Sequence, residues 1–174
     1  EHNVSPKSIV LVTFTKKAAQ EMISRVNMLA GQLGNQIRAG TFHHIANLFL
    51  RKYAKTIGFG NNFTILDKKN KKTLMKNLRA AAIPKGEKKM YPSTSAVLKM
   101  CWRMEKKKKK LDEILAYEYP EYEDKRQWIS QVIERFKKIK KENNTMDFDD
   151  LLIYFLQFLV ESKASSKVTQ SINH

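Results

Sequence analysis

The chain opens with a continuous hydrophobic and β-branched run that changes into a helical period. The run Ile9-Val10-Leu11-Val12, within residues 8–14, predicts a strand buried on both faces of a parallel sheet. Residues 18–33 then carry apolar side chains every three or four positions and stop at Gly34, which predicts a helix. Together they predict one strand–helix unit of a doubly wound layer.

A second unit of the same kind follows. Residues 37–42 predict a strand and residues 43–56 a helix, with the Thr41 hydroxyl placed to cap the helix start. A further short extended piece is expected over residues 63–66. These segments predict a parallel α/β layer at the start of the chain.

From Asp67 onward the period is helical, and Asp67 itself is placed as a helix cap. A Lys-, Gly- and Pro-containing loop is expected over residues 84–92. The last helix, capped by Asp147, is so apolar that we expect it to pack on several sides in a complete protein. Residues 163–174 are expected to fray. Between the loops we expect helices over residues 67–82, from Ser93 or Ser95 to 110, 111–117 and 123–142.

The charge of the chain narrows the class of partner. It has 174 residues, a hydrophobic fraction of 42% and a formal net charge of +16, of which residues 67–146 carry +12 with 23 basic and 11 acidic side chains. No apolar run approaches the roughly 20 residues of a membrane span, so we expect no membrane partner. The excess of positive charge favours DNA or RNA as the binding partner. The alternative is that the lysines form a solvated surface with no nucleic-acid partner.

Several residues that could take part in catalysis or binding are better explained by structural roles. Cys101 stands alone, which predicts a buried small side chain rather than a disulfide or metal site, in a cytoplasmic protein. The Asp147, Asp149 and Asp150 group opens a helix, where capping explains it better than catalysis or metal binding. Trp102 and Trp128 fall at apolar helical spacing and are expected in a core.

Two short segments carry the strongest functional pattern. Thr13-Phe14-Thr15 and Thr41-Phe42-His43 each follow a predicted strand and open a helix. Each therefore places hydroxyls, one aromatic ring and free helix-start N–H groups at the carboxyl end of a strand. Such an edge is suited to holding a phosphate backbone and stacking a base.

These two segments resemble motifs Ia and Ib of the UvrD/Rep/PcrA-like superfamily 1A DNA helicases. Phe63-Thr64-Ile65-Leu66-Asp67 and residues 146–152 continue the resemblance in the same order, so that it covers nearly the whole chain. It implies an α/β, predominantly helical fold, in which a partial RecA-like (P-loop NTPase-type) parallel layer carries an inserted all-helical subdomain. The implied division is a 1A layer over residues 1–66, a 1B-like insertion over 67–146, and a helix returning to the 1A layer over 147–174.

The resemblance implies which residues contact single-stranded DNA. Lys16 stands where the family commonly has Asn, which replaces an amide with a cation, and His44 replaces a Ser or Gly. Arg25 matches a position that faces the nucleotide cleft in some relatives, although a surface role is an alternative. The implied DNA-binding residues are Thr13, Phe14, Thr15, Lys16, Lys17, Thr41, Phe42 and His43.

Lys106, Lys107, Lys108, Lys109 and Lys110 form the densest basic run of the chain. A solvated helix end explains the run, since lysine suits the C-terminal end of a helix. The alternative is a patch on the helical insertion that contacts duplex phosphates at a junction.

The resemblance implies that the parent protein is an ATP- and Mg²⁺-dependent 3′ to 5′ DNA helicase. The chain contains no G-x-x-x-x-G-K-[ST] loop and no Walker B pair, so we expect it to hold no cofactor and to be inactive alone. It starts without Met, and we expect it to be a fragment whose partners are single-stranded DNA and the rest of the helicase. The alternatives are a protein–protein docking module and a fragment of an AddA/RecB-type helicase-nuclease.

Overall fold

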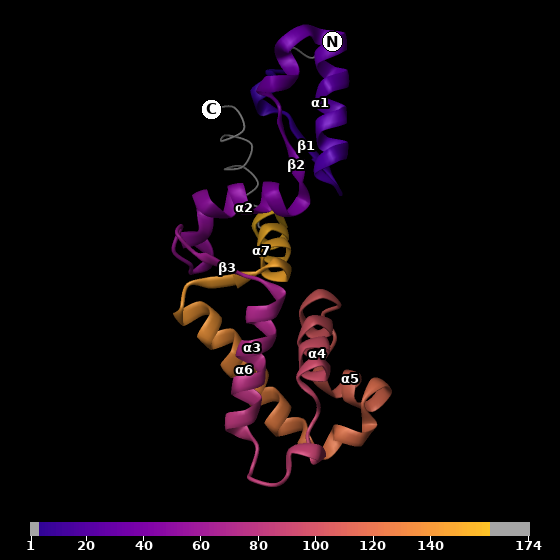
Figure 1. Ribbon diagram of the computed structural model, residues 1–174, viewed down its shortest axis with the longest axis vertical. Helices are drawn as coiled ribbons and strands as arrows, with labels where there is room; N and C mark the ends of the chain where they lie inside the picture. Colours follow the sequence, from indigo (N-terminus) through magenta and orange to yellow (C-terminus); the bar gives the residue numbers. More distant parts are fainter. Residues whose placement is uncertain (1–3, 161–174) are drawn as a thin grey trace. The chain divides into compact units, whose positions relative to one another are not determined.

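A computed structural model describes residues 4–160 of the chain. The described residues divide into two compact units (Figure 1). One unit consists of the residues up to Asn61 together with those from Asp150 onward, and the other is Asn62–Asp149. The structure is mostly helical, with two small parallel sheets, and no helix among the described residues is long and apolar enough to cross a membrane.

The first unit contains a pair of parallel strands, each followed by a helix. Strand β1 pairs with β2 so that Val10 lies opposite Arg38 and Thr13 opposite Thr41. Short 3₁₀ turns at Pro6–Ser8, Gly31–Gln36 and Ala54–Ile57 separate the regular elements. In chain order these elements are β1 (Val10–Thr13), α1 (Lys16–Ala30), β2 (Arg38–Thr41), α2 (Phe42–Tyr53) and the part of α7 (Phe148–Val160) that starts at Asp150.

The expected strands β1 and β2 are confirmed, but the expectation that β1 is buried on both faces is wrong. All four residues of β1 are only half-buried, and Ile9 just before it is exposed. The reason is that, among the described residues, β1 has β2 as its single neighbour. A continuous apolar run indicates that both faces of a strand need to be covered. In the described residues the faces of β1 are only partly covered.

Helix α1 begins as its sequence dictates but ends earlier than predicted. The Thr15 hydroxyl accepts a hydrogen bond from the Ala18 N–H at 3.1 Å, which satisfies one of the free donors of the first turn. The helix stops at Ala30 because Gly31 adopts φ +64° and ψ −152°, a backbone conformation that residues other than glycine rarely adopt. The predicted end at Gly34 is therefore wrong, and a 3₁₀ turn fills the interval.

The core of the first unit joins α2 and α7 to β1. Ile45, Phe49 and Phe158 are buried, and Tyr53 stacks on Phe158 with ring centroids 4.9 Å apart. The predicted packing of α7 on several sides stays a prediction for the complete protein; within the described residues Leu156 is 61% exposed. Further partly buried residues packed on this cluster are Val10, Val12 and Phe155.

The second unit is a helical cluster with a second parallel strand pair. β3 pairs with β4 so that Thr64 lies opposite Thr145 and Leu66 opposite Asp147. The expected caps are confirmed: the carboxylate of Asp67 accepts from Asn70 N–H, and the hydroxyl of Ser93 accepts from Ala96 N–H. The elements are β3 (Thr64–Leu66), α3 (Lys68–Ala82), α4 (Thr94–Lys106), α5 (Leu111–Glu118), α6 (Arg126–Glu142) and β4 (Thr145–Asp147), with 3₁₀ turns at Lys88–Met90 and Pro120–Lys125.

Two expectations for this unit are wrong. No strand is expected after residue 66, where the period is helical, yet strand β4 forms, and only its pairing with β3 reveals it. Helix α4 ends at Lys106 instead of 110, because the chain turns at Lys108, which has a φ of +50°. The basic run Lys106–Lys110 is therefore mainly a turn between two helices.

The two tryptophans of the second unit differ in burial. Trp128 packs on the core of the second unit and donates from Nε1 to the Ala82 carbonyl at 2.8 Å, whereas Trp102 is 38% exposed, so its predicted core position is wrong. Cys101 is buried as expected, and burial raises the pKa of its thiol to about 12. The fully buried members of this core include Met75, Met100, Ile114, Ile133 and Phe136.

Candidate nucleic-acid interface

The parallel register aligns the two predicted motifs. Since Thr13 and Thr41 are direct partners across β1 and β2, the residues that follow them leave the sheet at the same edge. The rings of Phe14 and Phe42 meet there, with centroids 5.4 Å apart and planes tilted by 52°. The structure thus brings the two segments, which are 28 positions apart in the sequence, into one site.

Phe14 is the most exposed ring of this site. It sits in the bend between the end of β1 and the start of α1, and 90% of its surface is accessible, against 43% for Phe42. Because the two rings are already in contact, a base has no space between them. A base would stack on the outer face of the pair.

The threonine hydroxyls of the site are not equivalent. Thr13 Oγ1 donates its hydrogen to the Thr15 carbonyl at 2.8 Å, so this hydroxyl closes the turn. The Oγ1 atoms of Thr15 and Thr41 instead accept from backbone N–H groups, at 3.1 Å and 3.3 Å. Since these bonds use the oxygen, the hydroxyl hydrogens of Thr15 and Thr41 can still be donated to a phosphate.

The two phenylalanines form one wall of an apolar groove within the first unit. The groove has a volume of about 480 Å³, and Thr13, Thr41 and His43 give it a polar edge. Its second wall comes from α7, which sequence reasoning missed as part of the site. The spacing of the α7 residues at three and four positions was the available signal, and those residues are Leu152, Phe155, Leu156 and Leu159.

The remaining motif residues divide between the groove and its surroundings. His43 is half-buried and lines the groove, while His44 lies against Gly40, where an added Cβ would stand 2.5 Å from His44 Cδ2. Lys16 and Lys17 are exposed in the first turn of α1, beside Phe14. The site therefore combines an apolar floor with cations at one margin.

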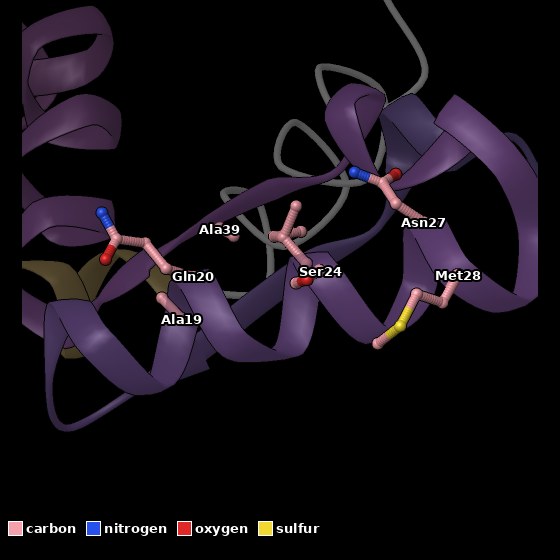
Figure 2. A pocket seen from close by; sticks show the side chains of 7 residues that line it. Ala19, Gln20, Ser24, Asn27, Met28 and Ala39 are labelled. Atoms are coloured by element: carbon pink, nitrogen blue, oxygen red, sulfur yellow. The ribbon is translucent and has the colours of Figure 1, made fainter.

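Arg25 lies outside this groove, exposed on α1. A separate hollow of about 580 Å³ lies over α1 and β2 (Figure 2) and includes Ala19, Ser24 and Ala39, and none of the described residues that line it is charged. Asn27 Oδ1 in this hollow accepts no hydrogen bond from the described residues. The proposed role of Arg25 near a nucleotide stays a prediction.

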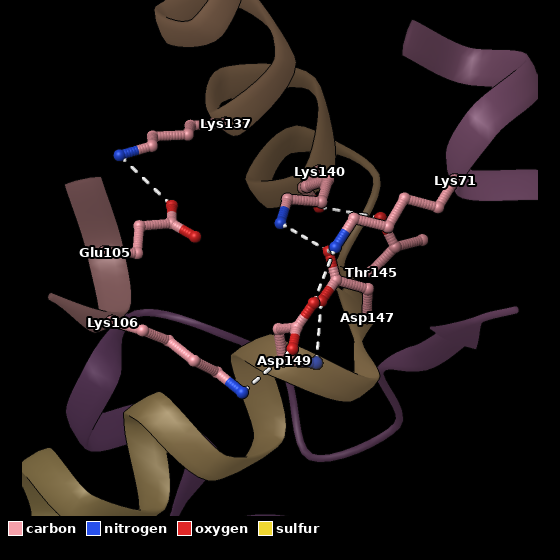
Figure 3. A network of polar contacts seen from close by, with 8 residues as sticks. All are labelled: Lys71, Glu105, Lys106, Lys137, Lys140, Thr145, Asp147 and Asp149. Carbon is pink, nitrogen blue, oxygen red and sulfur yellow. Dashed lines mark hydrogen bonds and ion pairs between the residues drawn. The ribbon is translucent and has the colours of Figure 1, made fainter. Parts of the chain in front are cut away.

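The acidic residues at the start of α7 belong to an ion-pair network of the second unit (Figure 3). Lys140 and Lys71 each approach Asp147 to 3.0 Å. Asp149 is held by Lys71 at 2.9 Å and by Lys106 at 3.0 Å. Asp147 also accepts from the Asp149 N–H at 2.8 Å, which confirms the predicted helix cap.

The lysines keep both carboxyl groups ionised. Burial alone would raise the pKa of Asp147, but Lys140 and Lys71 outweigh it and lower this pKa below its ordinary value. The pKa of Asp149 is lowered in the same way, against its burial, by Lys71 and Lys106. Burial opposes the charge of Lys71 too, yet the two carboxylates raise its pKa. No cluster of three or more metal-ligating side chains occurs within residues 4–160.

The structure divides the basic run Lys106–Lys110 into two groups. Lys106 bonds to Asp149 and lies over the Trp102 ring, 5.7 Å from its centroid, and Lys109 lies 3.7 Å from Glu118. Lys107, Lys108 and Lys110 are exposed, and no ion pair between described residues includes them. Only these three suit an external phosphate.

The fold defines a mixed α/β protein dominated by helices, with two strand ends that converge on one exposed aromatic site. The UvrD/REP helicase N-terminal domain family matches residues 1–174, and the chain belongs to this family. It is similar to the ATP-dependent DNA helicases PcrA of Staphylococcus epidermidis and Staphylococcus aureus, with 32% identity over 156 residues in each case. These matches cover 88% of the chain and 20% of each relative, so the chain spans about one fifth of the length of the curated relatives it matches.

Proposed function

We propose that this chain is the part of a 3′ to 5′ UvrD/Rep/PcrA-type DNA helicase that supplies contacts to single-stranded DNA. In this proposal the first unit belongs to the RecA-like 1A layer and the second to subdomain 1B. ATP and Mg²⁺ are bound by other parts of the parent protein, because this chain has no phosphate-binding loop of the Walker A type.

The exposure of Phe14 carries the proposal. A ring that is 90% exposed contributes almost nothing to the core, so the fold gives no reason for its position. Its neighbours supply what a single strand needs: a second ring at 5.4 Å, two hydroxyls that can donate, and the cations Lys16 and Lys17. Base stacking on such a ring is worth about 1–3 kcal/mol.

Each remaining part of the site has a distinct role in this proposal. The hydroxyls of Thr15 and Thr41 donate to phosphate oxygens, and His43 contacts the strand from the polar edge of the groove. Lys16 and Lys17 attract the backbone without reading sequence. Lys107, Lys108 and Lys110 are the members of the basic run that remain available for duplex phosphates at a junction.

Fluorescence anisotropy with a labelled single-stranded oligonucleotide tests the proposal. Phe14→Ala is compared with Leu29→Ala, because both side chains are 90% exposed, lie in the same unit and carry no charge. We expect Phe14→Ala to weaken binding by about 5- to 150-fold, the equivalent of about 1–3 kcal/mol, and Leu29→Ala to leave it unchanged.

A salt series completes the experiment. Binding of the wild-type chain should weaken as salt rises, since phosphate contacts release counterions. No binding at low salt, or equal losses in the two variants, would contradict the proposal and favour a protein-docking role.

A further inference from the structure

Thr13 and Thr41 occupy equivalent positions in the two strand–helix units. They are direct partners across β1 and β2, and each is followed by a phenylalanine, Phe14 or Phe42. Their position alone would predict the same role for both hydroxyls. Their hydrogen bonds indicate two different roles.

The two hydroxyls differ in the atom that the fold uses. Thr41 Oγ1 accepts from the His44 N–H at 3.3 Å, so its hydrogen can still be donated. Thr13 Oγ1 donates its single hydrogen to the Thr15 carbonyl at 2.8 Å. Because the oxygens of a phosphodiester can only accept hydrogen bonds at neutral pH, Thr13 cannot bond to a phosphate while its bond to Thr15 is intact.

The lengths of the two strand–helix connections explain why Thr13 makes this bond. Helix α2 starts at Phe42, directly after β2, so the helix itself fixes this residue. Helix α1 starts only at Lys16, and the two residues between β1 and α1, Phe14 and Thr15, form a bend. Phe14 therefore belongs to neither a strand nor a helix.

Hydrogen bonds at Thr15 tie this bend to β1 and to α1. The Thr15 carbonyl accepts from the Thr13 hydroxyl and also from the Ala19 N–H, at 3.2 Å. The Thr15 hydroxyl accepts from the Ala18 N–H in the first turn of α1. Since 90% of the surface of Phe14 is exposed, packing contributes little to the position of its ring, and the backbone of the bend has to fix it.

We propose that Thr13 is a positioning residue: its hydroxyl fixes the bend that presents Phe14 to a base, and it does not bind phosphate. The inference rests on the proposed function in taking Phe14 as the ring on which a base stacks. A ring on a fixed bend loses little conformational freedom when a base stacks on it, whereas a ring on a loose bend must first be ordered. The Thr13 hydroxyl therefore raises single-strand affinity without contacting DNA.

A double-mutant cycle with Phe14 tests this role by fluorescence anisotropy on a labelled single-stranded oligonucleotide. Thr13→Val removes the hydroxyl and keeps the β-branched shape that suits a strand. We expect it to weaken binding by about two- to tenfold, because one neutral hydrogen bond is lost. In a Phe14→Ala chain it should have no further effect, because the ring that it positions is absent. Thr13→Ser keeps the hydroxyl and should restore the affinity.

Lys17→Gln is the matched control in the same two backgrounds. Lys17 is exposed on α1, and its charge attracts phosphates whether or not the ring is present. We expect it to lower affinity by the same factor with and without Phe14 and to reduce the salt slope by about 0.7, whereas Thr13→Val should leave the slope unchanged. Equal losses from Thr13→Val in both backgrounds would overturn the inference, because they would indicate a direct contact with DNA.

NMR order parameters of the backbone N–H groups give a second readout that needs no DNA. The N–H groups of Phe14 and Thr15 should be rigid in the wild-type chain, with values near about 0.85. Thr13→Val should lower both values, and Thr13→Ser should keep them. Circular dichroism verifies that each variant is folded. Unchanged order parameters in Thr13→Val would show that the hydroxyl does not hold the bend, and the inference would fail.

The two readouts separate this inference from the proposed function. If Phe14→Ala weakens single-strand binding but Thr13→Val does not, the proposed function stands and the positioning role of Thr13 fails. If Phe14→Ala binds as tightly as the wild-type chain, the proposed function fails. Lowered order parameters in Thr13→Val would then still support the positioning of Phe14 by Thr13, and unchanged ones would overturn it.

Discussion

Asp147 shows how one buried side chain depends on its partners. Its carboxylate is almost fully buried, and Lys140, also buried, and Lys71 each lie 3.0 Å from it. Asp147→Asn would leave the Lys140 ammonium buried without this counter-charge, so we expect unfolding to become easier by about 3–5 kcal/mol. Urea unfolding followed by circular dichroism measures the change.

Glu142→Gln is the matched control for Asp147→Asn. Glu142 pairs with Lys138 at 3.7 Å, but both side chains are more than half exposed, so we expect a change of about 0.5 kcal/mol or less. Similar small effects of both substitutions would show that the buried network contributes little to stability.

The same network predicts a pH dependence of stability. The pKa values of Asp147 and Asp149 are lower in the folded chain than their ordinary value of 3.8, so the folded state binds fewer protons there than the unfolded state. Their stabilising contribution is therefore complete above pH 3.8 and is lost as the pH falls through the lowered pKa values. The raised pKa of Lys71 acts at the other end, with a contribution complete below 10.5 and lost as the pH rises through the raised value.

Urea unfolding at a series of acidic pH values measures this dependence. We expect the stability of the wild-type chain to fall on acidification more steeply than that of an Asp147→Asn, Asp149→Asn variant, whose amides do not titrate. If the stability of both proteins falls equally with pH, these carboxyl groups do not cause the loss of stability on acidification.

At the level of elements, Thr15 both starts α1 and borders the candidate DNA site. Its hydroxyl accepts from the Ala18 N–H, so Thr15→Ala should cost about 0.5–2 kcal/mol of stability. Thr15→Asn retains a capping oxygen and should keep most of that stability. Thermal unfolding compares the three proteins.

DNA binding by the same Thr15 variants separates the two roles of the hydroxyl. Because Asn also carries hydrogen-bond donors, Thr15→Asn should retain most of the single-strand affinity, whereas Thr15→Ala should lose part of it. If Thr15→Ala binds as well as the wild-type chain, the hydroxyl serves only to cap α1.

The elements that sequence reasoning predicted are those whose signals are local. Strands β1, β2 and β3 follow from short apolar runs, and the starts of α2 and α3 follow from the caps Thr41 and Asp67. Strand β4 was missed because it lacks a local apolar run and is defined by pairing with β3, about eighty positions earlier. A register between distant segments leaves no local pattern in either of them.

The sequence also predicted the candidate site only in part, namely the segments with a local signal. The Thr-Phe segments were found because each combines a strand end with a helix start, and the β1–β2 register then aligned them. Two features were not predicted: the wall contributed by α7, and the division of Lys106–Lys110 into paired and exposed lysines. Both depend on which side of a helix or turn faces a neighbour that is distant in sequence.

At the scale of the whole molecule, positive charge is distributed unevenly along the chain. The net charge is +16, with the excess concentrated in residues 67–146, while the exposed aromatic site lies in the first unit. We therefore expect the chain to bind DNA by itself but to be unable to use ATP. Triphosphate binding of the P-loop type requires a Gly-rich loop with its Lys and Ser or Thr, and the sequence contains none.

Two measurements check this expectation for the whole chain. Phosphate release in the presence of ATP, Mg²⁺ and single-stranded DNA should equal the rate without protein, and adding ATP should leave DNA affinity unchanged. The affinity control uses the same free Mg²⁺ concentration without ATP, because Mg²⁺ itself competes for DNA phosphates and weakens binding. DNA-stimulated hydrolysis that persists in a chain purified to constant specific activity would show that the sequence holds a nucleotide site unrelated to the P-loop type, and the division of roles between DNA contact here and ATP use elsewhere in the parent protein would be wrong.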